Sequence, residues 1–201
     1  MSTIEHVSLE VADPAAVRGV YTALALDDVV RLRQSESPTT GFRGFTLSLI
    51  VSQPSIVNGF VDAATDAGAI VITAPTKSLW GYGGSVQAPD GTIVTVASSS
   101  KKDTGTDTRQ VDEIVLQLGV EDVPTTKQFY ADRGFTVSKS YGRKYVEFDT
   151  APVKLTLNTR KAVAKAAGVS PDGDGSHRLV IATHGAGFTD PDGFVWEPAA
   201  G

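Results

Sequence analysis

Two stretches of the sequence, IEHVSLEVADP at residues 4–14 and VDEIVLQLGVEDVP at residues 111–124, decide the fold. In each, apolar residues alternate as in a half-buried strand, and an aspartate followed by proline then begins a helical segment. A second pair, PDGTIVTV at residues 89–96 and PDGFVWE at residues 191–197, places a tight turn before a strand. The sequence therefore predicts an internal repeat of strand, helix and closing strand.

The repeat divides the chain into a half at residues 1–98 and a half at residues 110–201, joined by a polar linker at residues 99–109 without hydrophobic periodicity. We expect helices at residues 14–24 and 159–167, among others, with short strands between the helices. The last module is expected to be shortened, because residues 184–190 leave no room for a helix. The predicted fold class is α+β, with tandem βαβββ modules forming two curved mixed-sheet halves.

The first strand with His6 and Asp13, the helix with an aromatic residue near its end and the closing Pro-Asp-Gly strand together resemble the vicinal oxygen chelate superfamily. This superfamily includes glyoxalase I, extradiol dioxygenases and bleomycin resistance proteins. The resemblance covers nearly the whole chain and implies a two-domain glyoxalase-like protein whose paired modules curl around a cavity. Because the same fold hosts lyases, dioxygenases and metal-free binders, the activity has to be argued from the site.

The composition of the 201 residues excludes several classes of function. The net charge of −5, without a basic cluster, predicts no nucleic-acid partner and no membrane partner. The absence of cysteine excludes disulfides, thiol catalysis and thiolate metal sites. No export signal or long apolar run is visible, so we expect a cytoplasmic monomer or homodimer with a small-molecule ligand.

The resemblance also indicates where metal ligands would lie, because metalloenzymes of this superfamily take them from the first and last strands of modules. In the first half, His6 stands at such a position. Its partner four residues after Gly91 is Thr95 rather than glutamate, and the strand near Phe45 offers no histidine. The first half is therefore predicted to be metal-free.

The second half matches the pattern better. Glu197 lies four residues after a turn glycine, His177 opens a strand, and Glu113 lies on the first strand. These three could bind Fe, Mn, Ni or Zn through two carboxylates and an imidazole. Lys154 stands at the fourth position and would neutralise the carboxylates in place of a metal. We therefore expect no cofactor, with a divalent metal as the alternative.

Two groups of residues are candidates for ligand binding. In the first strand, alternation predicts that His6, Ser8 and Glu10 face the cavity. Residues 77–84 combine glycines with two aromatic residues, which suits a loop that closes over a planar ligand. The predicted linings are His6, Ser8, Glu10, Trp80, Tyr82 and Thr95 in one half, and Glu113, Gln117, Lys154 and Glu197 in the other.

Three functions follow from these observations. The first is a glyoxalase- or bleomycin-resistance-like binder that sequesters or weakly processes a hydrophobic or aromatic compound. The second is a metal-dependent lyase or dioxygenase that uses Glu113, His177 and Glu197. The third is metal-free acid/base catalysis by Glu113, Lys154 and Glu197.

Overall fold

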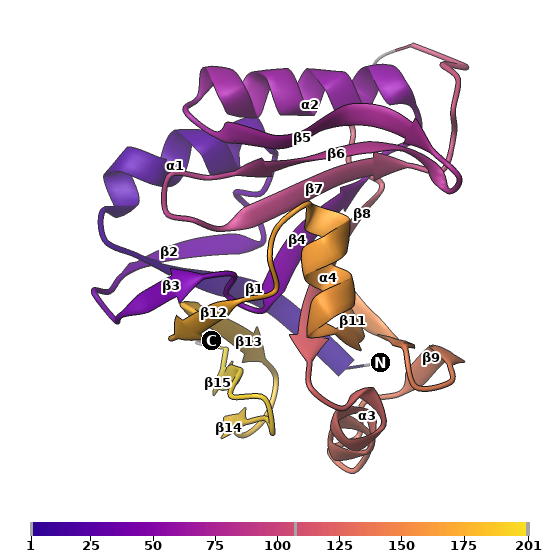
Figure 1. Ribbon diagram of the computed structural model, residues 1–201. Coiled ribbons are helices and arrows are strands. Elements are labelled where there is room, and N and C mark those ends of the chain that lie inside the picture. Colours follow the sequence, from indigo (N-terminus) through magenta and orange to yellow (C-terminus); the bar gives the residue numbers. More distant parts are fainter. Residues whose placement is uncertain (1, 107, 200–201) are drawn as a thin grey trace.

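The computed structural model describes residues 2–106 and 108–199. Its helices and strands build an α+β fold in which 13 strands join in one large mixed sheet, strongly curved (Figure 1). A separate two-stranded sheet pairs β3 (Thr39–Gly41) with β12 (Gly173–Gly175). The strands of the large sheet fall into four modules, numbered here along the chain, and the predicted fold class is confirmed.

Module 1 is short. It consists of β1 (Ser2–Val11), α1 (Pro14–Ala23) and β2 (Val30–Gln34), with β2 parallel to β1. The helix begins where the sequence predicts, because the Asp13 carboxylate accepts hydrogen bonds from the backbone N–H groups of Ala15 and Ala16. Pro14 fits the first helical position, where no N–H donor is needed.

Module 2 is a complete βαβββ unit. It consists of β4 (Phe45–Ile50), α2 (Pro54–Asp66), β5 (Ile70–Ser78), β6 (Gly81–Gln87) and β7 (Ile93–Ser98). β7 lies parallel to β4, and β6 and β5 follow in antiparallel order to the edge of the sheet.

Module 3 repeats this plan. It consists of β8 (Glu113–Val120), α3 (Val123–Ala131), β9 (Val137–Tyr141), β10 (Tyr145–Phe148) and β11 (Thr150–Thr159). As in module 2, the last strand lies parallel to the first and the two middle strands are antiparallel.

Module 4 is trimmed, as the sequence predicts. After α4 (Arg160–Ala167) it has only β13 (Leu179–Thr183), β14 (Phe188–Thr189) and β15 (Val195–Pro198). The short segment between β13 and β14 forms no helix within the part of the chain that the structure describes.

The first strands of the modules determine which modules pair. β4 pairs antiparallel with β8, so modules 2 and 3 form an inner pair. β1 pairs antiparallel with β13, so modules 1 and 4 form an outer pair. The predicted boundary at residues 99–109 falls between β7 and β8, and both pairings cross it.

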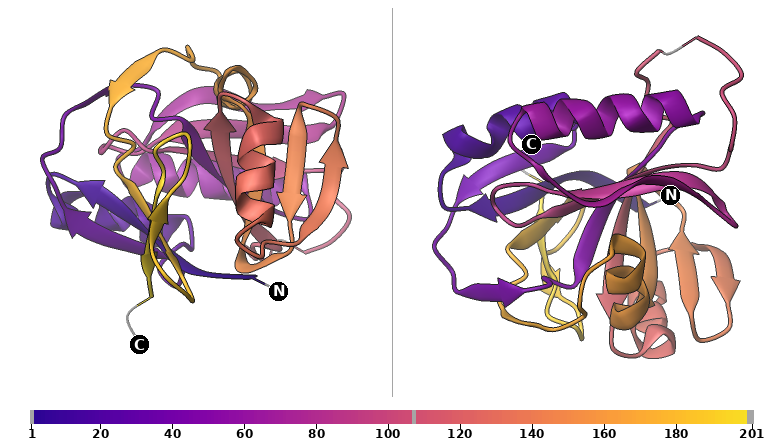
Figure 2. Two further views of the ribbon diagram at one scale, coloured as in Figure 1. Left: turned by 90° about the horizontal axis from the view of Figure 1, so that it is seen from below. Right: turned by 45° about the horizontal axis from the view of Figure 1, so that its top comes forward.

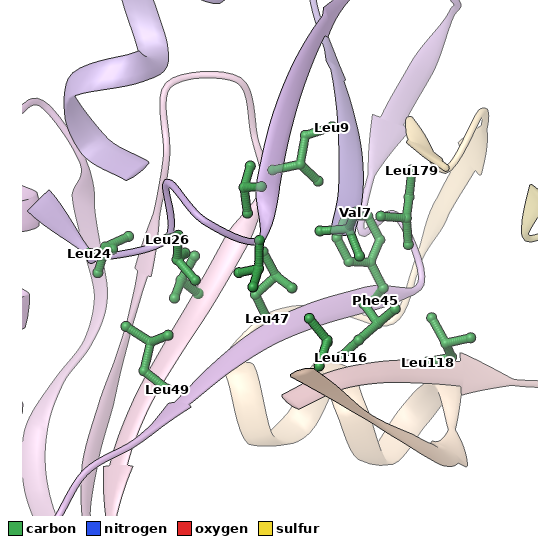
Figure 3. Packing of buried hydrophobic residues seen from close by; sticks show 14 of the residues in the cluster. Val7, Leu9, Leu24, Leu26, Phe45, Leu47, Leu49, Leu116, Leu118 and Leu179 are labelled. Atoms are coloured by element: carbon green, nitrogen blue, oxygen red, sulfur yellow. The ribbon is translucent and has the colours of Figure 1, made fainter. Parts of the chain in front are cut away.

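The two pairs share one hydrophobic core. Leu9 and Leu179 of the outer pair and Leu47 and Leu116 of the inner pair are at most 3% exposed and belong to the same buried cluster (Figure 3). α1 and α2 lie next to each other over one face of the sheet (Figure 2). α1 and α2 thus cover the apolar face, and polar side chains gather on the opposite face.

The repeated Pro-Asp-Gly turns connect one module to the next. The Tyr21 hydroxyl on α1 donates to Asp90 in the turn before β7, at 2.7 Å. The Tyr130 hydroxyl on α3 donates to Asp190 in the turn before β15, also at 2.7 Å. Each tyrosine thus ties a helix to the turn of the following module, although Asp90 follows the turn proline and Asp190 precedes it.

Candidate functional site

The polar face of the inner pair carries rows of side chains that cross the strands. The register places Lys154 of β11 beside Val115 of β8, Val115 opposite Ser48 of β4, and Ser48 beside Thr95 of β7. Directly opposed residues share a face of the sheet, so these four side chains form one row. The row lies on the face away from the buried leucines.

The next row contains Thr156, Gln117 and Thr46, with Gln117 in the middle. The hydroxyls of Thr46 and Thr156 are buried and have no hydrogen-bond partner among the residues that the structure describes. Burying an unpaired hydroxyl costs roughly 1–3 kcal/mol. These two threonines therefore destabilise the fold locally.

The helix α4 covers part of this polar face, as its upright position over β4, β7, β8 and β11 in Figure 1 illustrates. It buries Val163, Ala164 and Ala167 in a small cluster with Phe42 and Ile93. The contact is close because β8 has a glycine at position 119, where a Cβ would lie 2.9 Å from the Arg160 Cα atom. α4 therefore packs directly on the polar face of β4, β7, β8 and β11.

A groove of about 370 Å³ is left between α4 and the hairpin of β5 and β6. Ser48, Thr95 and Gln117 line its floor, Ala166 of α4 forms one wall, and Trp80 lies on its rim. The Trp80 side chain is 85% exposed. The volume is within the range of sites for small organic ligands.

The floor of the groove is a hydrogen-bonded chain. The Gln117 Nε2 group donates to Ser48 Oγ at 3.0 Å, and Ser48 Oγ lies 2.5 Å from Thr95 Oγ1. The sequence predicts that Thr95 and Gln117 line pockets in different halves. The structure brings them together because modules 2 and 3 pair across the linker.

A cluster of charges lies on the same sheet face. Lys154 Nζ is 2.5 Å from Glu113 Oε2 and 3.5 Å from Glu147 Oε1, and Lys139 Nζ is 3.4 Å from Glu147 Oε2. The hydrogen bond to Glu113 is the main cause that raises the pKa of Lys154. Lys154 is therefore protonated at neutral pH.

Glu147 is the most buried member of this cluster. Burial alone would raise its pKa, but hydrogen bonds from Tyr145 and Ser138 and the positive charges of Lys154 and Lys139 together hold it below the usual value. Glu147 is therefore ionised at neutral pH and balances the lysines.

The segment at residues 77–84 is not the predicted loop. β5 and β6 pair through Lys77 opposite Tyr82 and Ser78 opposite Gly81, so only Leu79 and Trp80 form the turn of a tight hairpin. The Tyr82 hydroxyl donates to Asn58 on α2, on the other face of the sheet, at 2.9 Å. Of the two expected aromatic groups, only Trp80 therefore projects freely beside the groove.

The polar face of the outer pair carries His6, Ser8 and Glu10, in the alternation that the sequence predicts. The pKa of His6 is lowered, first by burial and then by the charge of Arg31. The Arg33 guanidinium lies 3.1 Å from Glu10 and 3.2 Å from Glu197, and the Arg33 and Glu197 side chains are 42% and 49% exposed. Glu197 thus shares an ion-pair partner with Glu10 in the outer pair and does not join Glu113.

His177 has structural contacts. Its ring nitrogens lie 2.5 Å from the backbone oxygen of Arg43 and 3.0 Å from that of Asp192, and its ring stacks on Phe194. Arg43 stands at the equivalent position before β4 and donates to the backbone oxygen of Asp90. Both residues clamp the Pro-Asp-Gly turn of their own module.

The predicted metal triad is consequently not assembled. Glu113 is bound to Lys154, His177 to backbone carbonyls and Glu197 to Arg33. In residues 2–106 and 108–199, no three acidic or histidine side chains form a group that could hold a metal ion. The alternation within each strand was predicted correctly, but the assignment of strands to a common site was not.

Three residues of the candidate site are not predicted from the sequence. Ser48 could have been found, because Thr46 and Ser48 alternate with apolar neighbours in the predicted strand near Phe45. Glu147 and Ala166 carry no such signal, since the packing of β10 and α4 alone gives them their places.

The fold is that of solved glyoxalases. Glyoxalase I from Zea mays superimposes with a TM-score of 0.61 at 16% identity, over 98% of this chain and 91% of that chain. A glyoxalase I mutant from Zea mays gives a TM-score of 0.60 at 16% identity, over 97% of this chain and 92% of that chain. This similarity shows that the chain has the vicinal oxygen chelate fold that its repeats indicate.

No protein-family model matches the sequence, and no curated protein matches it. Within the described residues, no helix is long and apolar enough to span a membrane.

Proposed function

We propose that this chain is a small-molecule-binding protein whose ligand occupies the groove between α4 and the hairpin of β5 and β6. The observation that carries the proposal is the groove floor. Ser48 and Thr95 lie at first- and last-strand positions, where the resemblance predicts metal ligands, and they form a hydrogen-bonded chain with Gln117 instead. An exposed tryptophan at the rim offers a ring on which an aromatic ligand can stack.

The donor sets do not fit a divalent metal in either pair. The inner row offers an ammonium, a valine and two hydroxyls, none of which is a strong ligand of Fe, Mn, Ni or Zn. The corresponding row of the outer pair places His6 opposite Ala182 and Ala182 beside Glu197, which leaves at most two ligands. A metal-dependent lyase or dioxygenase is therefore the weaker candidate, and elemental analysis of untagged protein should find no stoichiometric metal.

Acid/base catalysis by the charged cluster is also less favoured. A general base works best when its pKa lies near the operating pH. The raised pKa of Lys154 and the lowered pKa of Glu147 move both groups away from neutrality. We propose instead that Glu113, Lys154 and Glu147 fix the sheet beside the groove.

Intrinsic fluorescence tests the proposal, because the two tryptophans differ. Trp80 lies at the groove and Trp196 is 1% exposed in the core. In a library of mono- and bicyclic aromatic compounds, we expect binders that change the fluorescence in the native protein but not in Trp80→Phe. Analysis of the recovered compounds should show no turnover.

A variant of α4 provides the decisive control. Ala166→Leu adds volume to the groove wall and should weaken binding at least tenfold. Ala162→Leu makes the same change on an exposed position of α4 that does not line the groove, and should leave binding unchanged. Equal affinity in both variants, or turnover of a bound compound, would contradict the proposal. The cytoplasmic location and the monomeric or homodimeric state remain proposals from the sequence.

A further inference from the structure

The groove is lined by uncharged groups. In the described part of the chain, its lining contains no Asp, Glu, Lys, Arg or His, and its one ionisable side chain, Tyr82, turns away to Asn58. The hydroxyl-bearing residues among those that line it are Ser48, Thr73, Thr76, Ser78, Thr95 and Ser98. The nearby charges of Lys154 and Glu113 neutralise each other across 2.5 Å.

This lining disfavours an ionic ligand. A carboxylate or an ammonium group that enters the groove would lose hydration without meeting an opposite charge. An uncharged polar ligand loses its hydrogen bonds to water in the groove, but hydroxyl and amide groups of the lining can replace them. The chemistry of the lining therefore selects against both signs of charge.

The hydrogen bonds of the floor leave several donor and acceptor groups without a partner among the described residues. Between Ser48 and Thr95 one hydroxyl donates to the other, and Ser48 also accepts from Gln117. Whichever hydroxyl donates, one hydroxyl proton is left without an acceptor among the described residues. The Gln117 Oε1 atom likewise receives no hydrogen bond within residues 2–106 and 108–199. The second N–H of the Gln117 Nε2 group has no acceptor among the described residues either. The floor thus offers a hydroxyl donor and an amide donor beside the Gln117 Oε1 acceptor.

We infer that the groove takes an uncharged, planar ligand that carries a hydrogen-bond acceptor next to a donor, as in a carboxamide, a lactam or a hydroxy ketone. The acceptor meets the free hydroxyl of the Ser48–Thr95 pair, and the donor meets Gln117 Oε1. The ring system extends toward Trp80. This inference rests on the proposed function and specifies the chemical class of the ligand.

Three probes of one shape test the charge preference. 2-Naphthamide is neutral and has an acceptor beside a donor, 2-naphthoate is an anion, and 2-naphthamidine is a cation at pH 7. We expect the amide to bind the native protein at least tenfold more tightly than either ion, as measured by titration of Trp80 fluorescence and by calorimetry. Equal or tighter binding of an ion would overturn the inference.

A fourth probe tests the pairing with Gln117. Methyl 2-naphthyl ketone has the acceptor without the donor. Gln117→Leu should weaken the amide at least fivefold and leave the ketone within twofold, which a general loss of structure would not do. Equal losses for amide and ketone would overturn the assigned contact.

The outcomes also separate the inference from the proposed function. If an ion binds best and Ala166→Leu abolishes its binding, the groove is a ligand site but the inferred class is wrong. If none of the four probes binds, the inference is overturned, and the library screen with Ala166→Leu decides the proposed function by itself.

Discussion

The inner and outer pairs use the same strand positions for different purposes. Thr95 and Glu197 both lie four residues after a turn glycine, on strands parallel to the first strand of their module. In the inner pair the position contributes to the floor of a groove beneath α4. In the outer pair it holds an exposed ion pair with Arg33. The first strands pair antiparallel in both pairs, but the presence of α4 over the inner pair changes what its polar face can bind.

The turn clamps show the same divergence. Arg43 in the inner pair is a buried cation that faces Asp90, with side chains 8% and 2% exposed. His177 in the outer pair reaches the same kind of turn through hydrogen bonds to backbone carbonyls. One position of the repeat is thus stabilised by a buried ion pair in one copy and by hydrogen bonds in the other.

The largest effect is expected from breaking the clamp of the inner pair. Asp90→Ala leaves the Arg43 guanidinium buried without its carboxylate, which costs about 3–5 kcal/mol of unfolding free energy. His177→Ala removes hydrogen bonds and a stacked ring and should cost about 1–2 kcal/mol. Urea unfolding measures both values. A smaller loss in Asp90→Ala than in His177→Ala would contradict this account of the clamps.

Removal of an unpaired buried hydroxyl of the inner pair is expected to increase the unfolding free energy. Thr156→Val keeps the shape of the side chain and removes a buried hydroxyl without a partner, so it should add about 1 kcal/mol. Thr183→Val in the outer pair is the matched control, because its hydroxyl donates to the Thr3 carbonyl at 2.8 Å. That variant should lose about 1 kcal/mol. Thermal unfolding that shifts both variants in the same direction would refute the assignment.

The two pairs should respond to acid in different pH ranges. Burial and Arg31 lower the folded-state pKa of His6, so the folded chain binds fewer protons there than the unfolded chain. The unfolding free energy should therefore decrease as the pH falls below about 6.5. His6→Asn should remove this decrease, and urea unfolding between pH 5 and pH 8 measures it.

In the inner pair, titration of Glu147 determines the pH range in which stability changes. Its pKa is also lowered in the folded state, so its contribution to stability is present above about pH 4.3 and is lost as the pH falls through the folded value. Glu147→Gln should flatten the profile below about pH 4.3 and leave the His6 range unchanged. Flattening of both ranges by one variant would show that the two pairs do not titrate independently.

The smallest effect is expected from the exposed ion pair of the outer pair. Glu197→Gln should change the unfolding free energy by less than about 1 kcal/mol, because both partners are substantially solvated. The change should disappear in about 1 M salt, where the screening length falls to about 3 Å. A salt-independent loss above about 2 kcal/mol would mean that Arg33 and Glu197 have a different structural role.

Most of the secondary structure could be predicted from the sequence. The helix expected at residues 14–24 is α1, the one expected at 159–167 is α4, and Asp13 caps the former as its sequence signature indicates. Trp196, the neighbour of Glu197 on β15, is buried among aromatic rings. The hairpin at residues 77–84 was missed because its glycines are typical of a loop, whereas strand pairing with β7 orders them.

The sequence by itself determined the repeat, the alternation of each strand and the helix starts, because these depend on neighbours along the chain. It also determined that His6, Ser8 and Glu10 share a face. Only the tertiary structure decided that module 2 pairs with module 3, that Ser48 links Thr95 to Gln117, and that α4 packs on the polar face of the inner pair. Those contacts join residues distant in sequence, and their geometry depends on strand pairing and helix packing, which the local pattern of polar and apolar residues does not encode.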